Sequence, residues 1–334
     1  MSLARSFRYL FFIVGVGLLF LLIQKIGLKT IVFDIRMIGW RFFPLFCISF
    51  LWYLFYTYGW NQFLKRTTGK IRFAELFRIK IAGEAVNVLT PVNFVGGDPM
   101  RIYMLKRNIP VTEAAASVVV DRTLHSMATL LVVVIGIIIS FLTLDHLPEN
   151  IQYGVPIVLC IALLFIGFIF VHQRRGIFSF FLSFCQKIGI ERKFSEKTIQ
   201  RFEELDSHII DFYQSHHRDF LIALGAHTLG RFLGVVEIYV VGRIVSDDFT
   251  LFAALVLCAL APMINLLFTF VPGALGILEG AYSGVLYLLG FDPSLGITIQ
   301  VAKRLRAGCW VALGLLFLGA ETRKKAYEEK FEEA

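Results

Sequence analysis

Apolar stretches recur along this chain from residue 9 to residue 320, with only short polar breaks between them. The sequence is 57% hydrophobic and 17% charged, whereas a soluble globular protein is about 45–50% apolar and about 25% charged. A soluble chain of this length would divide into domains joined by polar linkers, which are absent from the sequence. The pattern therefore indicates a protein embedded in a lipid bilayer, where only helices satisfy the backbone of such segments.

Seven apolar segments have about the length that a transmembrane helix needs. We expect these spans at residues 9–23, 42–64, 113–144, 152–171, 220–244, 251–270 and 294–320. Arg5 and Arg8 precede the first segment, but no small-residue cleavage site follows it, so we interpret it as an uncleaved span. The predicted fold is an all-α, polytopic transmembrane bundle of about seven to eight spans, with one membrane domain at residues 1–322 and a charged cytoplasmic tail at 323–334.

The positive charges lie between the apolar stretches. The formal net charge is +8, but Lys and Arg do not gather with aromatic residues on one soluble face, so we expect no nucleic-acid partner. Segment 172–218 is rich in Lys and Arg, whereas residues 145–151 contain neither. The positive-inside rule therefore predicts a multi-pass protein of the cell (inner) membrane with loop 172–218 in the cytoplasm. Apolar residues at helical spacing after Ser195, a candidate N-cap, predict an amphipathic interfacial helix within this insert.

Two apolar segments are broken by turn-forming residues. In residues 73–107, we expect one helix to end near Leu89 and another to begin with Asp98 as its N-cap. The second break is followed by about 15 apolar residues, fewer than the roughly 20 that a span requires. The residues that make these breaks, and that we expect to line a cavity, are Thr90, Pro91, Gly96, Gly97, Pro272, Gly273 and Gly276.

Breaks at membrane depth occur where protein or water covers the backbone. Paired breaks in the two halves of a transporter point to its binding site and are compatible with an inverted repeat. We therefore expect two re-entrant half-helices with the functional site between them.

The motifs around these breaks resemble a known family. Gly96-Gly97-Asp98-Pro99-Met100-Arg101, Asp121-Arg122 and the segment from Pro272 to Glu279 resemble the flippase-like membrane domain of lysylphosphatidylglycerol synthases. That family usually has Gly-Gly-Glu and Glu-Arg, whereas this chain has Asp98 and Asp121, which keep the charge and shorten its reach. The 334 residues contain no aminoacyl-transferase domain. The resemblance thus implies a protein that moves a lipid without aminoacylating it.

Several basic residues fall inside apolar segments, where each charge costs about 2.5–3.5 kcal/mol and marks a candidate functional site. We expect them to bind an anionic or aminoacylated lipid headgroup, because guanidinium groups bind phosphate through two hydrogen bonds. An alternative is that the last helix begins later and its cations reach the interface. The candidate headgroup-binding residues are Arg101, Arg122, Lys303, Arg304 and Arg306.

Carboxylates accompany these cations, as candidates for proton coupling or for structural ion pairs. They are Glu279, Asp121, Glu84 and Asp98. For Asp98 we favour helix capping over ion coordination, and for Asp121 an i,i+4 pair with His125 is as good an interpretation as a headgroup site. Gly276, Gly280 and Gly284 repeat every four residues, which favours close helix packing.

The leading hypothesis is a lipid translocase that is not itself driven by ATP. We expect no catalytic residues, metal or cofactor, since no phosphate-binding loop or metal-ligand motif occurs. Membrane lipids are the expected partners, together with a second copy of the chain or a partner envelope-lipid enzyme. A transporter of a small soluble anion, an intramembrane lipid-modifying enzyme and a non-catalytic assembly partner remain alternatives.

Overall fold

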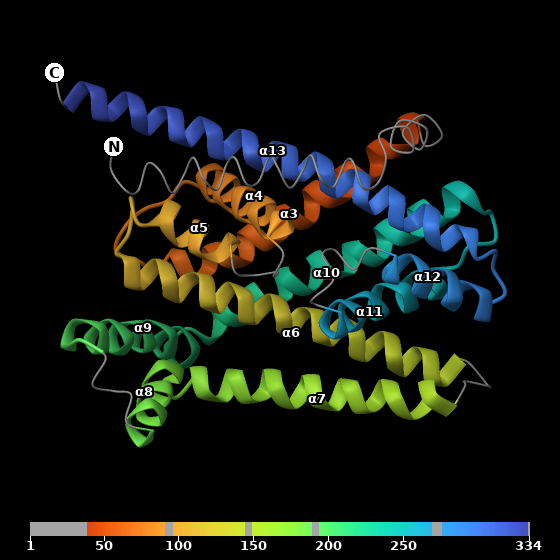
Figure 1. Cartoon of the computed structure of the whole chain (residues 1–334), viewed down its shortest axis with the longest axis horizontal. Helices are drawn as coiled ribbons and strands as arrows, with labels where there is room; N and C mark the ends of the chain where they lie inside the picture. Colours follow the sequence, from red (N-terminus) through yellow and green to blue (C-terminus); the bar gives the residue numbers. More distant parts are fainter. Residues whose placement is uncertain (1–38, 91–95, 144–148, 189–193, 269–275, 333–334) are drawn as a thin grey trace.

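A computed structural model describes residues 39–90, 96–143, 149–188, 194–268 and 276–332. The regular elements of these ranges are all helices, which agrees with the predicted all-α fold. They are η1 (Gly39–Phe42), α3 (Phe43–Leu64), α4 (Phe73–Leu89), α5 (Gly97–Leu105), α6 (Val111–Thr143), α7 (Glu149–Gln173), α8 (Ile177–Lys187), α9 (Glu196–Ser215), α10 (His217–Val245), α11 (Leu251–Leu267), α12 (Ile277–Leu288) and α13 (Ser294–Glu332) (Figure 1).

Three described helices, α6, α7 and α10, are long and apolar enough to cross a membrane, and α11 is a shorter apolar helix. Helices α3 and α13 also have the length of a span. Neither is among these three, because α3 contains many Tyr, Trp and polar residues and α13 contains charged residues. The predicted first span at residues 9–23 lies outside the described residues. Helix α13 begins at Ser294, so the alternative in which it begins beyond its three central cations is wrong.

The centre of the bundle is formed by α3 and α10, which cross in close contact. Glycines on both helices allow this approach. A Cβ atom on Gly59 would lie 2.8 Å from the His227 ring, and one on Gly230 would collide with the Tyr56 ring. A larger residue at either position would therefore force the facing ring, or the helix that carries it, to shift.

The helices around α3 and α10 include two sets of three with the same order of elements. In α4–α5–α6 and in α11–α12–α13, a helix leads to a break, a short helix and then a long helix. Helix α4 packs on α13 while α11 packs on α6, so the two sets exchange equivalent contacts. In Figure 1, α5 and α12 lie at opposite ends of the bundle, and α6 and α13 run in opposite directions. This is the arrangement of an inverted repeat.

Helices α8 and α9 form the predicted amphipathic insert at the edge of the bundle. The Ser195 hydroxyl accepts a hydrogen bond from the Thr198 backbone N–H, as expected of an N-cap. The carboxylate of Asp206 in α9 accepts bonds from the backbone N–H groups of Phe178 and Ser179 at 3.0 and 2.7 Å, which holds the start of α8. Apolar residues of α9 are buried against α6 and α10.

Two sequence-based expectations about the half-helices are wrong. Gly96, not Asp98, occupies the N-cap position of α5, and Asp98 is its second residue. A Cβ atom on Gly276, Gly280 or Gly284 would meet no atom within 4 Å among the described residues, so these glycines make no close helix contact there. The close approach of α12 to α13 depends instead on Gly296, where a Cβ would collide with the backbone at Ser283.

Candidate functional site

A cavity of about 610 Å³ lies between α3, α4, α5, α6, α7, α10, α11 and α13. Six cationic side chains and three carboxylates line it, although apolar surroundings disfavour unpaired charges. The cations are Lys80, Arg101, Arg122, Arg231, Lys303 and Arg306, and the carboxylates are Glu84, Asp121 and Glu237.

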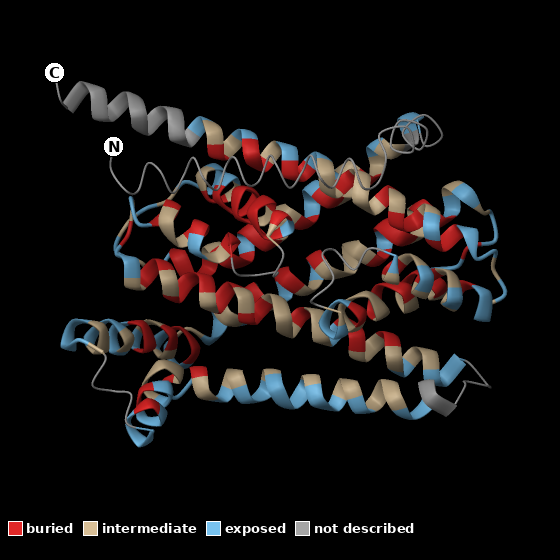
Figure 2. Ribbon diagram, viewed as in Figure 1, coloured by how far each residue is buried: buried red, intermediate tan, exposed pale blue. Residues whose placement is uncertain are grey.

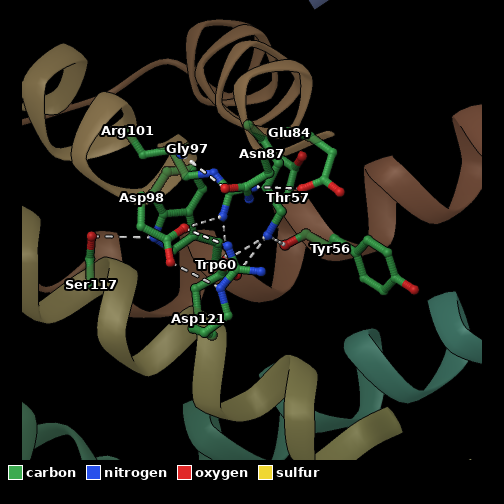
Figure 3. A network of polar contacts seen from close by, with 12 residues as sticks. Tyr56, Thr57, Trp60, Glu84, Asn87, Gly97, Asp98, Arg101, Ser117 and Asp121 are labelled. Carbon is green, nitrogen blue, oxygen red and sulfur yellow. Dashed lines mark hydrogen bonds and ion pairs between the residues drawn. The ribbon is translucent and has the colours of Figure 1, made fainter. Parts of the chain in front are cut away.

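A deeply buried ion pair of the cavity joins α4 to α6. The Lys80 ammonium donates hydrogen bonds to both carboxylate oxygens of Asp121, at 2.7 and 2.8 Å, and a weaker one to the backbone oxygen of Tyr56 (Figure 3). The His227 Nε2 atom on α10 lies 3.2 Å from the same carboxylate. Lys80 and Asp121 are 4% and 3% exposed. Both charges have lost their contact with water, and their attraction to each other offsets this desolvation penalty.

His125 does not pair with Asp121 as the i,i+4 interpretation suggested. Its ring packs edge-on against Tyr56, with centroids 4.8 Å apart, while Asp121 binds Lys80 from another helix.

Arg101 connects the first half-helix to the cavity wall. Its guanidinium donates to Glu84 at 3.1 Å and to Asp98 at 3.2 Å, and it lies 3.8 Å from Asp121. The arginine is only 2% exposed. Gly83 provides the space for it, since a Cβ there would lie 2.5 Å from the Arg101 Cγ and Nε atoms. The Arg101 Nε atom is buried without a hydrogen-bond partner among the described residues.

Asp98 in turn binds Arg122 of α6 through two contacts. Arg122 Nη2 donates to Asp98 Oδ1 at 2.5 Å, and Arg122 Nε donates to Asp98 Oδ2 at 3.1 Å. This parallel geometry is the strong form of a guanidinium–carboxylate pair. The start of α5 is thereby fixed to α6.

The backbone at the first break is held by a side chain that the sequence analysis missed. Asn87 Oδ1 accepts a hydrogen bond of 2.9 Å from the Gly97 backbone N–H, one of the unpaired amides at the start of α5. A Cβ on Gly97 would collide with Asn87, and one on Gly96 would collide with Thr90. The break therefore requires both glycines, while Pro91 lies outside the described residues.

The second half-helix has an equivalent ion pair. Glu279 Oε2 accepts a hydrogen bond from the Gly276 backbone N–H at 2.9 Å, and Glu279 Oε1 binds Arg304 Nη2 at 2.5 Å and Nε at 2.7 Å. Gly276 has φ +82°, a conformation that glycine adopts without strain. Arg304 is therefore bound to the start of α12 and does not line the cavity. Pro272 and Gly273 lie outside the described residues.

The other two of the three central cations of α13, Lys303 and Arg306, face the cavity. Arg306 pairs with Glu237 of α10, which is 1% exposed, and its guanidinium lies over the Trp52 ring at 4.4 Å. Lys303 donates to the hydroxyl of Tyr282 at 3.1 Å.

An apolar wall of the cavity comes from α11 and α7. The residues that α7 contributes follow helical spacing, so one stripe of α7 faces inwards while its other side is exposed (Figure 2). Residues of α6 extend this apolar wall. The α7 and α6 residues concerned are Val158, Leu159, Ala162 and Ile166 of α7 and Leu130 and Val133 of α6.

The comparison with known proteins agrees with this helical architecture. The model of the lysylphosphatidylglycerol synthase TM region matches residues 9–314. The chain belongs to this family. It is 22% identical over 318 residues to a UPF0104 membrane protein of Pyrococcus horikoshii, covering 89% of this chain and 92% of the relative. A UPF0104 membrane protein of Methanothermobacter thermautotrophicus is 23% identical over 267 residues, covering 77% and 78%. No solved structure gives a significant match.

Membership of the lysylphosphatidylglycerol synthase TM region family establishes a membrane protein and confirms the resemblance found in the motifs. The structure brings Arg101, Arg122, Asp98, Asp121 and Glu84 together. Sequence reasoning missed Lys80, Asn87, His227 and Tyr56. Lys80 is a cation within an apolar segment, which hydropathy alone marks as unusual. The other three residues carry no comparable signal.

Proposed function

We propose that this protein is a lipid translocase whose central cavity binds an anionic or aminoacylated lipid headgroup. The observation that carries the proposal is that charged and apolar side chains line the same cavity. A lipid combines the same two kinds of surface, a charged headgroup and apolar acyl chains. The loosely covered helix α7 would let acyl chains remain in the bilayer while the headgroup crosses.

The charged side chains of the cavity support headgroup binding. Ionisable side chains within a membrane protein are costly and usually face a substrate pathway or a water-filled cavity. Here they are concentrated around one cavity that Arg101 of the first half-helix helps to line, and transporters built on inverted repeats bind their substrates near such broken helices. The energy source would be an ion gradient, the membrane potential or the lipid gradient, without ATP hydrolysis by this chain.

The proposed setting is the cell membrane, with loop 172–218 and the tail at 323–334 in the cytoplasm and residues 1–322 forming one flippase-like domain. Lys and Arg in the loop follow the positive-inside rule. The basic loop is also the proposed contact for a second copy or for a partner enzyme of envelope-lipid synthesis.

Reconstitution tests this function. Purified protein in phosphatidylcholine liposomes should speed the transbilayer movement of fluorescently labelled anionic or aminoacylated lipids. Arg101→Gln should abolish this activity, whereas Arg243→Gln, on the exposed surface of α10 outside the cavity, should leave it intact. Unchanged movement of every lipid in a broad panel would overturn the proposal. Uptake of a soluble anion without lipid movement would instead favour the soluble-anion transporter.

A further inference from the structure

The cavity charges do not balance. Four of its six cations are within 4.0 Å of a carboxylate, counting Asp98 at the edge of the site. Each of these four has its own acidic partner, so together they contribute no net charge. The pairs are Lys80–Asp121, Arg101–Glu84, Arg122–Asp98 and Arg306–Glu237.

Lys303 and Arg231 are the two cations outside these pairs. Lys303 donates to Tyr282, a neutral phenol. The Nε atom of Arg231 is buried and has no hydrogen-bond partner in the described part of the chain. Within those same residue ranges, neither side chain forms an ion pair with a carboxylate. Among the described residues, the positive charges at the cavity therefore exceed the negative charges by two.

The two excess charges come from neighbouring helices. Arg231 lies on α10 and Lys303 on α13, which contact each other, and both side chains line the cavity. An uncompensated charge in a low-dielectric site is costly, so a bound ligand that supplies the opposite charge gains binding free energy. A guanidinium and an ammonium group can bind one phosphate together. The guanidinium donates two parallel hydrogen bonds to phosphate oxygens, and the ammonium attracts them as a point charge.

We propose that the preferred substrate is a lipid whose phosphate carries two negative charges, namely a phosphate monoester or a diphosphate. This inference rests on the proposed translocase function and narrows its substrate class. A phosphate monoester has a second pKa near 6 and carries about −1.5 to −2 at pH 7. A phosphodiester headgroup carries only one negative charge and leaves one cation unmatched. An aminoacylated headgroup adds positive charge to a site that already has an excess.

Binding measurements on the full-length protein in detergent test the preference directly. The probes are phosphatidic acid, a prenyl diphosphate, phosphatidylglycerol, lysylphosphatidylglycerol and phosphatidylcholine, with inorganic phosphate and pyrophosphate as lipid-free arms. The monoester and the diphosphate should bind about tenfold more tightly than the phosphodiester, because a charge-assisted hydrogen bond contributes roughly 1.5–3 kcal/mol. Equal affinities for all five lipids, or tightest binding of phosphatidylglycerol, lysylphosphatidylglycerol or phosphatidylcholine, would overturn the inference.

Variants identify the residues responsible. Arg231→Gln and Lys303→Gln should each reduce the preference for the monoester over the diester about tenfold, while Arg243→Gln should leave it unchanged. A retained preference in both cavity variants would contradict the assignment. Should a variant fail to fold, the wild-type lipid panel still decides the question.

The possible outcomes distinguish a wrong substrate class from a wrong translocase function. Rapid movement of phosphatidylglycerol in liposomes, without preferential binding of dianionic lipids, would overturn the substrate class and leave the translocase standing. Binding of inorganic phosphate as tight as that of the lipids would overturn the lipid assignment. No movement of any lipid would overturn the translocase itself.

Discussion

Asp98 and Arg122 form a two-point ion pair, with Oδ1 to Nη2 at 2.5 Å and Oδ2 to Nε at 3.1 Å, that fixes the first turn of α5 to α6. Glu279 and Arg304 form its counterpart between α12 and α13, also at 2.5 Å. Each pair joins the start of a half-helix to the long helix that follows it. The two pairs lie in equivalent positions of the two repeats, so we expect each to hold one half-helix in place during the proposed lipid movement.

The first prediction concerns the Asp98–Arg122 pair. Asp98→Asn should lower the free energy of unfolding by about 1–3 kcal/mol and slow lipid movement, because Arg122, whose side chain is only 23% exposed, loses its two-point partner. Thermal unfolding in detergent and the liposome assay measure both effects. Asp247→Asn, on the exposed loop after α10, is the control. A double-mutant cycle with Arg122→Gln should give a coupling free energy clearly above zero, and purely additive effects would contradict the pair's importance.

The second prediction concerns the buried Lys80–Asp121 pair. Lys80→Met leaves the Asp121 carboxylate without its ammonium partner and should destabilise the fold by about 3–5 kcal/mol. Adding Asp121→Leu removes the orphaned charge and should restore much of the thermal stability, while translocation stays impaired. Lys197→Met, on the exposed side of α9, should change neither property. A double variant no more stable than Lys80→Met would argue against charge burial as the cause.

The third prediction tests the space that Gly83 leaves for Arg101. Gly83→Ala places a methyl group 2.5 Å from the arginine side chain, and such overpacking costs about 1–3 kcal/mol. Arg101 should move, with loss of stability and of lipid movement. Gly225→Ala is the matched helical control, because its Cβ meets no atom within 4 Å, and it should be neutral or stabilising by up to about 1 kcal/mol. Equal behaviour of the two variants would contradict the close contact.

The all-helical fold and the position of the first break could be predicted from the sequence. Hydropathy located the apolar segments that form helices. The turn-forming residues from Thr90 to Pro99 indicated that one helix ends near Leu89, where α4 ends in the structure. The capping role of Asp98 was wrong because capping rules consider only local backbone. In the structure a guanidinium 24 positions away competes for the same carboxylate.

The assembly of the site could be predicted only in part. Asp121 and Arg122 were candidates as intramembrane charges, but their partners Lys80 and Asp98 come from other helices, and helical spacing says nothing of contacts between helices. The glycines of α12 show the same limit. Their spacing of four suggested a packing face, whereas the close contact is made by Gly296 of α13.

The last prediction tests whether water reaches the cavity. Cys258 and Cys185 are almost equally buried, at 6% and 5% exposed, but only Cys258 lines the cavity. In variants that retain one cysteine each, a charged methanethiosulfonate reagent should therefore modify Cys258 faster than Cys185. A charged reagent reaches a buried thiol only where water also reaches it. Mass spectrometry over a time course gives both rates. A bound phosphate lipid should slow the modification of Cys258 alone, since its headgroup would occupy the cavity. Equal rates at the two cysteines would show that the charged part of the cavity is dry, and a hydrated headgroup pathway through this cavity would then be wrong.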